Sequence, residues 1–362
     1  MRSIGLDIAR CLAIILVLIS HIRVFFEKFW DVQTFSINGL LGVELFFVLS
    51  GFLIGGILIR DVYEGDGSLR VFLIRRWFRT LPSYFLVLSL LVIIGALVGT
   101  PYYFQHFLFI QNFNYSQMSF FAVSWSLSIE EWFYLFIAVF IYLLSKRDEK
   151  YRRILFFSLC AFVIFGSIGV KFFYTYNYDP LWDAGIRKQI FLRMDSLMFG
   201  VLLAGIKYYF KTFYARINSF YLFLLFFLSI VIINIYYIFA LDSGREAINN
   251  SIISRTVFFD FISLTFMFFI WLLDKSNIVN QIKNKYIQKA ITFLAITSYS
   301  VYLIHYDIFR LFNNMTTSVS SYTLMILIVL FTLLLVYILA LLMFLYWEKP
   351  IMNWRERFVK KV

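Results

Sequence analysis

The amino-acid sequence predicts an all-α integral membrane protein, a polytopic helical bundle of about ten transmembrane helices with both termini cytoplasmic. Hydrophobic residues make up 62% of its 362 residues and charged residues 15%, whereas soluble domains have about 45–50% and about 25%. Several apolar runs reach the roughly 20 residues needed to cross a bilayer. Because one water-soluble core could not hide this much apolar surface, the composition excludes a soluble enzyme, a disordered protein and a nucleic-acid binder.

Apolar runs between charged breaks define the expected spans in chain order. They lie near residues 6–26, 38–59, 80–99, 124–145, 154–174, 187–207, 219–241, 255–273, 291–312 and 320–347. The first run carries Asp7 and Arg10 and is followed by no small-residue cleavage site, so we expect a retained helix rather than a signal peptide. With no linker or repeat, we expect one membrane domain over residues 1–350 and a short basic cytoplasmic tail over 351–362.

The positions of Lys and Arg predict the orientation of these spans. The chain has 33 Lys and Arg against 21 Asp and Glu, a net charge of +12. Most of the cations fall in the N-terminus, the tail and alternate breaks, and the long break over 100–123 has none. Cytoplasmic loops carry an excess of Lys and Arg, so both termini are expected in the cytoplasm. The net charge then reflects topology rather than a nucleic-acid partner.

The two cysteines, Cys11 and Cys160, both lie in apolar runs. This placement favours buried packing thiols over a disulfide, and no spacing of Cys, His, Asp or Glu is typical of a metal site. We therefore expect no metal.

Ionisable residues inside the expected spans are the first functional candidates, because placing them in a bilayer is costly. Counting residues from the end of each span, at 1.5 Å per residue, predicts one common depth in the outer half of the membrane for several of them. These residues are His21, Glu44, Glu130, Glu131, Arg193, Asp195 and His305. The shared depth predicts a single site.

The first span also carries Arg10, eleven residues before His21. At about 100° per residue the two side chains share one helix face, about 16 Å apart along the axis. Arg75, Arg76 and Arg79 follow on one turn of the second cytoplasmic loop. Since arginine binds phosphates bidentately, a phosphate-rich cytosolic ligand with a thin tail would fit these residues. Coenzyme A thioesters have that shape.

Seven motifs in order resemble those of acyltransferase family 3, the polytopic membrane acyltransferases that modify bacterial cell-surface glycans. GLDIARCLAIILVLISH is similar to the family's first-span signature, with Arg10 and His21 as its Arg and His. The other motifs are GVELFFVLSGFLI, FLIRRWFRTLPSYF, SWSLSIEEWFYLF with Glu130, RMDSLMFG, SYSVYLIH and WEKP. The resemblance covers about residues 5 to 350.

The resemblance implies transfer of an acyl group, usually acetyl from acetyl-CoA, to a sugar hydroxyl. The acceptor would be a cell-surface glycan or lipid-linked oligosaccharide of the O-antigen, capsule or exopolysaccharide type, and the protein a multi-pass protein of the bacterial cytoplasmic (inner) membrane. Expected partners are acyl-CoA as co-substrate, the glycan or glycolipid acceptor and membrane lipids, with no permanently bound cofactor. The chain ends soon after the last span, so we expect the stand-alone form without an extracytoplasmic hydrolase-like domain.

The residue types fit this chemistry. A hydroxyl that attacks a thioester must lose its proton, and a neutral imidazole such as His21 suits that task. Glu130 would orient the imidazole, as the carboxylate of a catalytic triad does. Alternatively, His21 is the nucleophile and carries the acyl group transiently. Arg193 or a backbone N–H would stabilise the oxyanion.

Other candidates have structural alternatives that the sequence leaves open. His305 either supports the acceptor or transition state, or hydrogen-bonds across helices. The loop arginines bind the donor or set topology, and Arg193 with Asp195 forms either part of the site or a structural ion pair. Trp125 would stack on a sugar face, and Glu44 would support the same site. His106 is expected in an interfacial aromatic helix.

Two other function classes compete with the enzyme. In a secondary transporter or proton-coupled exporter, the buried His, Glu and Arg would form a substrate or proton path. A glycan-export partner would need no chemistry of its own. The sequence has neither repeat halves nor paired Gly/Pro breaks, which favours the enzyme.

Overall fold

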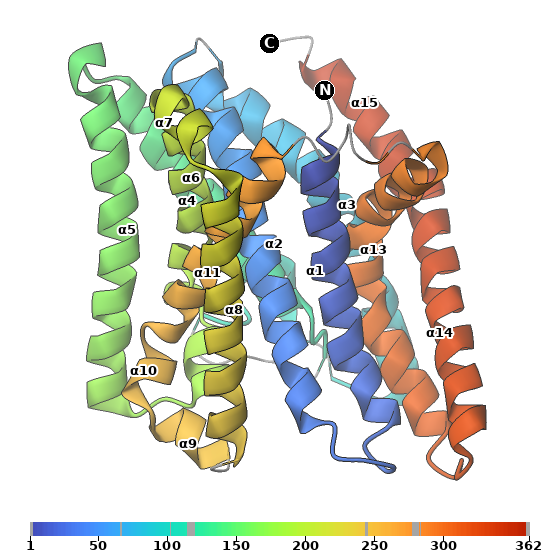
Figure 1. The fold of residues 1–362 in the computed structure, drawn as a ribbon. Coiled ribbons are helices and arrows are strands. Elements are labelled where there is room, and N and C mark those ends of the chain that lie inside the picture. Colours follow the sequence, from blue (N-terminus) through green and yellow to red (C-terminus); the bar gives the residue numbers. More distant parts are fainter. Residues whose placement is uncertain are drawn as a thin grey trace.

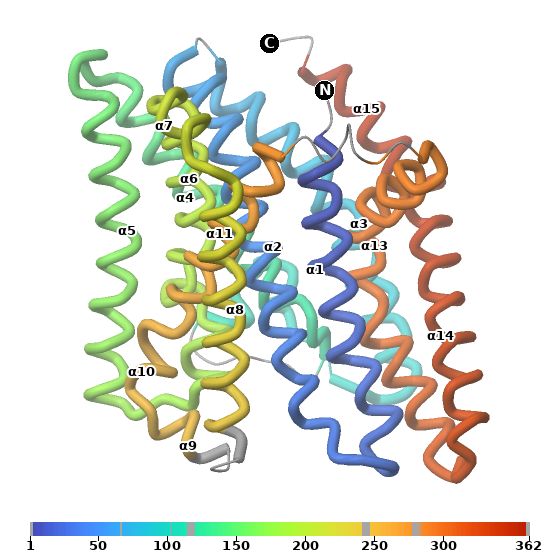
Figure 2. Tube along the Cα trace, in the orientation of Figure 1, coloured from blue at the N-terminus to red at the C-terminus, as the bar shows by residue number. Residues whose placement is uncertain are grey.

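The computed structural model is a bundle of helices (Figure 1). It describes residues 3–65, 67–101, 103–113, 120–242, 245–276, 282 and 284–359, and no strand occurs in those ranges. Figures 1 and 2 place the start of the first helix and the last helix, α15, at the same end of the bundle.

The chain forms long helices joined by short helical turns. The helices are α1 (Ile4–Ile22), α2 (Ser36–Ile57), α3 (Leu69–Val98), α4 (Ser124–Ser145), α5 (Glu149–Tyr178), α6 (Met194–Tyr209), α7 (Lys211–Arg216), α8 (Ser219–Asp242), α9 (Arg245–Asn250), α10 (Ile252–Arg255), α11 (Phe258–Lys275), α13 (Lys285–Met315), α14 (Tyr322–Met343) and α15 (Lys349–Val359). Single turns of 3₁₀-helix cover Arg23–Phe25, Gln33–Phe35 and Phe104–Leu108, and π-helical turns cover Leu58–Tyr63, Trp182–Arg187 and Phe344–Glu348.

Eight helical stretches of the described chain are long and apolar enough to cross a membrane. They contain α1, α2, α3, α4, α5, α8, α13 and α14. The expected spans near 187–207 and 255–273 correspond to the shorter α6, of 16 residues, and to α11, of 18 residues. The predicted polytopic helical membrane bundle is thus confirmed.

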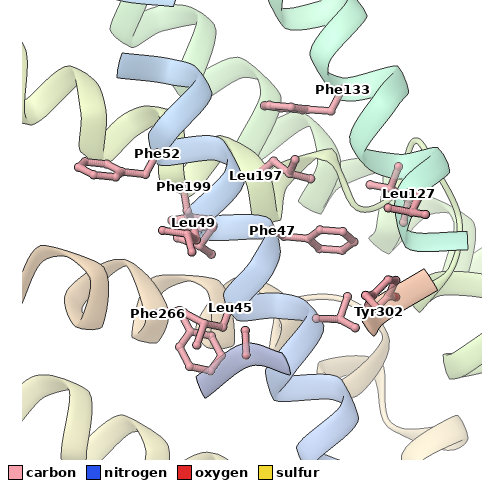
Figure 3. Packing of buried hydrophobic residues seen from close by; sticks show 14 of the residues in the cluster. Leu45, Phe47, Leu49, Phe52, Leu127, Phe133, Leu197, Phe199, Phe266 and Tyr302 are labelled. Atoms are coloured by element: carbon pink, nitrogen blue, oxygen red, sulfur yellow. The ribbon is translucent and has the colours of Figure 1, made fainter. Parts of the chain in front are cut away.

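The hydrophobic core is built around α2, which packs against α1, α6 and α11. Figure 3 shows Phe47 and Phe52 of α2 with Leu197 of α6 and Phe266 of α11, all in one cluster of buried side chains. The peripheral helices α5, α8 and α14 instead expose rows of Phe and Leu, such as Phe162. Exposed apolar side chains on the outside of the bundle are the reverse of the pattern in soluble proteins, and they are expected where the outer surface contacts lipid.

Small residues allow α2 and α6 to lie in contact along their backbones. A Cβ atom at Gly51 of α2 would overlap the carbonyl oxygen of Leu197, and one at Gly200 of α6 would overlap that of Val48. Close backbone approach through glycine is a general mode of helix association in membranes. It fixes the position of α2, on which much of the site below depends.

The connection between α3 and α4 is partly buried. His106 and Asn112 are fully buried, and the Asn112 side-chain amide donates to the carbonyl oxygens of Trp125 and Lys188. The helical turn expected at His106 is present over Phe104–Leu108, with Phe104 and Leu108 exposed. Its place at a membrane interface stays a prediction. Irregular backbone is tolerated at this depth because protein groups satisfy its hydrogen bonds. Residues 114–119 lie outside the described ranges.

We predict that Gly51→Ala destabilises the protein by about 1–3 kcal/mol, because an added methyl group overpacks the contact between α2 and α6. Gly56→Ala is the matched control: it lies on the same helix, and its Cβ would meet nothing within 4 Å. Helix propensity predicts that this control stabilises the helix by up to about 1 kcal/mol. Thermal unfolding in detergent measures both variants, and equal shifts would contradict the predicted close contact.

Candidate functional site

Two cavities open inside the bundle. One, of about 510 Å³, is lined by Arg10, Arg76, Arg79 and Arg355, and we call it the arginine cavity. The other, of about 410 Å³, contains His21, and we call it the histidine cavity. Because Arg10 and His21 lie eleven residues apart on α1, the helix rise separates these two lining positions by about 16 Å.

Among the residues that the structure describes, two line both cavities, Val43 of α2 and Tyr302 of α13. Tyr302 shares a hydrogen bond of 2.6 Å with Ser126 of α4, hydroxyl to hydroxyl. Figure 3 shows its ring on the same side of α2 as Phe47 and Leu127. The side chains of Val43 and Tyr302 therefore separate the two cavities.

A hydrogen-bonded ion pair forms one wall of the arginine cavity. Arg76 of α3 lies 3.1 Å from the Glu130 carboxylate of α4, and its guanidinium lies over the ring of Tyr134 at 4.0 Å. The Tyr134 hydroxyl donates to the same carboxylate at 2.6 Å, and Ser50 donates at 3.3 Å. The pair ties α2, α3 and α4 together.

The remaining arginines of this cavity have different surroundings. Arg10 pairs with Asp7 at 2.8 Å, and Arg355 of α15 donates to the backbone carbonyl of Arg75. For Arg79, no hydrogen bond or ion pair is found within the described residues, and its side chain is exposed to the cavity. Arg79 is thus placed to meet an anionic ligand. Arg75, also predicted as a donor ligand, is exposed on α3 and does not line the cavity.

In the histidine cavity, His21 packs against two aromatic side chains of α13. Its ring centroid lies 5.1 Å from that of His305 and 5.1 Å from that of Tyr306. Among the residues that the structure describes, none hydrogen-bonds to the imidazole of His21. Both ring nitrogens are therefore available to a ligand in the cavity.

His305 is held in one tautomer by its own helix. Its Nδ1 lies 3.1 Å from the carbonyl oxygen of Val301 and 2.8 Å from that of Tyr302, so Nδ1 carries a proton. The Nε2 atom is buried, with no hydrogen-bond partner in the described structure. The sequence predicted His21 and His305 at one common depth, and the structure brings their rings together.

Asp183 lines the histidine cavity but was not among the predicted site residues. Asp183 accepts from Arg187 at 2.8 Å and from Lys188. Burial by itself would raise the pKa of Asp183, but the adjacent Arg187 and Lys188 cations hold it below its ordinary value. Arg187 also lies 5.0 Å over the ring of Trp125, the face predicted to stack on a sugar.

The predicted pairing of Glu130 with His21 is not formed. Glu130 lines the arginine cavity, where Arg76, Tyr134 and Ser50 bind its carboxylate, whereas His21 lines the other cavity. Trp125, in the first turn of α4, already lines the histidine cavity, and Glu130 lies more than one turn further along the helix, at the arginine cavity. Glu131 accepts from Thr80 of α3 at 2.9 Å.

Glu44, Arg193 and Asp195 lie in a buried charge network that lines neither cavity. Arg193 donates to Glu44 at 2.6 Å, and Asp195 binds Lys171 at 2.5 Å. Lys171 also binds Asp260. Arg193 and Asp195 approach each other only to 3.9 Å, so each has a nearer partner than the one predicted. The rule that singled out Arg193 would also have found Lys171 and Asp260, which lie in expected spans.

Within the described ranges, no group of His, Cys, Asp or Glu is arranged to hold a metal ion. Cys11 and Cys160 are buried free thiols.

Comparison with known proteins gives three findings. A family model described as an acyltransferase domain, the model of acyltransferase family 3, matches residues 3–347. A Staphylococcus aureus (strain COL) protein named "Putative O-acetyltransferase" is 31% identical over 223 residues, which are 55% of this chain and 34% of that protein. The peptidoglycan O-acetyltransferase OatA of Listeria monocytogenes is 28% identical over 197 residues, 49% of this chain and 30% of its own length.

The chain therefore matches only about a third of the length of these curated relatives. No solved structure matches it.

We predict that Arg76→Ala destabilises the protein by about 1–3 kcal/mol, because the buried Glu130 carboxylate loses its cation. Arg75→Ala, one residue away on the exposed face, should change the free energy of unfolding by less than about 0.5 kcal/mol. The double variant Arg76→Ala/Glu130→Gln should recover part of the loss, since no unpaired charge remains. Thermal unfolding of the four proteins, wild type included, tests the pair, and a double variant no more stable than Arg76→Ala would contradict it.

Proposed function

The chain belongs to acyltransferase family 3, and from that premise we propose that it is a membrane O-acetyltransferase that moves an acetyl group from cytosolic acetyl-CoA to a hydroxyl of a cell-surface glycan. One observation carries the proposal. The arginine cavity and the histidine cavity, which contains the imidazole of His21, are separated by the side chains of Val43 and Tyr302. The setting would be the bacterial cytoplasmic membrane, with the arginine cavity open to the cytoplasm.

The arginine cavity suits the donor. Its four arginines face two glutamates, Glu130 and Glu348, so the cavity is electropositive. One guanidinium group can donate two parallel hydrogen bonds to phosphate oxygens. Arg79 and Arg355 supply such groups in this cavity. The phosphates of coenzyme A would lie there, and the thioester arm would extend toward Tyr302.

His21 would perform the proton chemistry on the other side of Tyr302. As general base it takes the proton of the acceptor hydroxyl, whose oxygen bonds to the thioester carbonyl carbon. The carbon–sulfur bond then breaks, and the proton passes to the CoA thiolate. As nucleophile, a ring nitrogen of His21 would instead bond to the thioester carbonyl carbon and expel CoA as the thiolate. The acceptor hydroxyl would then take the acetyl group from His21, and its proton would pass to the thiolate. Either route needs the free imidazole nitrogens described above.

The acceptor hydroxyl would enter through the histidine cavity. Gln33, Asn249 and Lys188 line it with hydrogen-bonding groups suited to a saccharide. The name of the Listeria relative makes peptidoglycan the first glycan to test. O-antigen, capsule and exopolysaccharide units, including lipid-linked oligosaccharides, are the further candidates.

We expect His21→Ala to abolish CoA release from acetyl-CoA by the purified protein in the presence of glycan, a loss of at least about a hundredfold. Thermal unfolding of the variant should stay close to that of wild type, because His21 makes no hydrogen bond to the described residues. Turnover by His21→Ala at the wild-type rate would refute the assignment. A wild-type protein that neither binds nor consumes acetyl-CoA would favour the transporter alternative.

Arg79→Ala should raise the KM for acetyl-CoA by about ten- to a hundredfold, the equivalent of one lost charged hydrogen bond of about 1.5–3 kcal/mol. Arg70→Ala is the matched control, an exposed arginine of the same helix that does not line the arginine cavity. Steady-state kinetics of CoA release distinguish the two variants. If both shift the KM equally, bulk charge rather than the cavity attracts the donor.

A further inference from the structure

We propose that Tyr302, together with Val43, selects the donor by the size of its acyl group. This inference rests on the proposed function, in which the thioester arrives through the arginine cavity and reacts beside His21. The acyl carbon must then lie at the boundary between the two cavities. Tyr302 and Val43 are the only described residues that line both cavities, so their side chains bound the space in which the acyl group reacts.

The position of the Tyr302 ring is fixed from several sides. Its hydroxyl shares a hydrogen bond with Ser126 at 2.6 Å, and its ring packs edge-on against Phe46, with centroids 6.0 Å apart. The ring centroid of His305, one turn further along α13, lies 5.7 Å from that of Tyr302. Only 7% of the side chain's surface is exposed. The ring is thus a packed partition rather than a loose side chain.

The partition can yield by a small amount only. A single hydroxyl–hydroxyl hydrogen bond contributes little net stability, so a slight rotation of the Tyr302 ring is accessible at each turnover. Room for further methylene groups of a longer acyl chain would require the Tyr302 ring to move against Phe46 and His305. A packed core tolerates little overpacking of this kind. An acetyl group therefore fits, and each added carbon is penalised.

Tyr302 differs in position from Tyr299, another tyrosine that lines the arginine cavity. Tyr299 lies three residues earlier on the same helix, lines only the arginine cavity and donates to the carbonyl oxygen of Thr80. Enlarging the cavity there adds space beside the donor's arm but none at the boundary. Tyr299 is thus a matched control for the acyl-size effect.

The test measures kcat/KM of the full-length purified protein for acetyl-, propionyl-, butyryl- and hexanoyl-CoA with one glycan acceptor. Tyr302→Ala should raise the butyryl-to-acetyl ratio of kcat/KM at least about tenfold, since each methylene that gains space is worth about 1–3 kcal/mol. Val43→Ala enlarges the same boundary from α2 and should shift the ratio in the same direction. Tyr302→Phe keeps the ring and should keep the ratio, as should Tyr299→Ala.

The outcomes separate this inference from the proposed function. A wild-type protein that does not use acetyl-CoA would refute the proposed function itself. An active wild type whose ratio is unchanged in both Tyr302→Ala and Val43→Ala would refute the size selection alone. If Tyr302→Ala fails to fold, Tyr302→Leu and Val43→Ala carry the test, because both enlarge the boundary while keeping an apolar side chain. A ratio that rises equally in Tyr299→Ala would also overturn the inference.

Discussion

A lipid bilayer offers no water to a buried charge, and this constraint accounts for where the ionisable residues of the protein lie. Some are paired inside the bundle: Lys171 bridges Asp195 and Asp260, and Arg193 binds Glu44. Others line a cavity, where a ligand or water can solvate them. Pairing stabilises the arrangement of helices, whereas cavity lining leaves groups such as Arg79 and His21 available for chemistry. Arg76 and Glu130 combine both, since they pair with each other and line the arginine cavity.

The fold makes this division possible by fixing three helices. The glycine contact between α2 and α6 holds Val43 in place, and α1 carries Arg10 and His21 to opposite ends of one helix face. Helix α13 contributes Tyr302 at the boundary and His305 beside His21. Each of α1, α2 and α13 therefore contributes residues to both cavities.

Periodicity and charge counting predicted what depends on a single helix. The bundle, the common face of Arg10 and His21, and the grouping of Arg76 and Arg79 on one helix turn follow from helix geometry and charge placement alone. What depends on an irregular connection was not predicted: the connection before α4 starts that helix at the histidine cavity, where Trp125 lies, and Glu130 therefore lies at the arginine cavity. Asp183 was missed for the same reason, because it lies in a π-helical turn between two helices. Which carboxylate pairs with which cation is a matter of packing that spacing does not determine.

The central claim is that donor and acceptor approach one partition from opposite sides. Cryo-electron microscopy of the full-length protein with a non-hydrolysable acetyl-CoA analogue tests it most directly. The account predicts the phosphates of the analogue beside Arg79 and Arg355, and its acyl end at Tyr302 facing His21. Density for the nucleotide in the histidine cavity, or on the outer surface of the bundle, would contradict it.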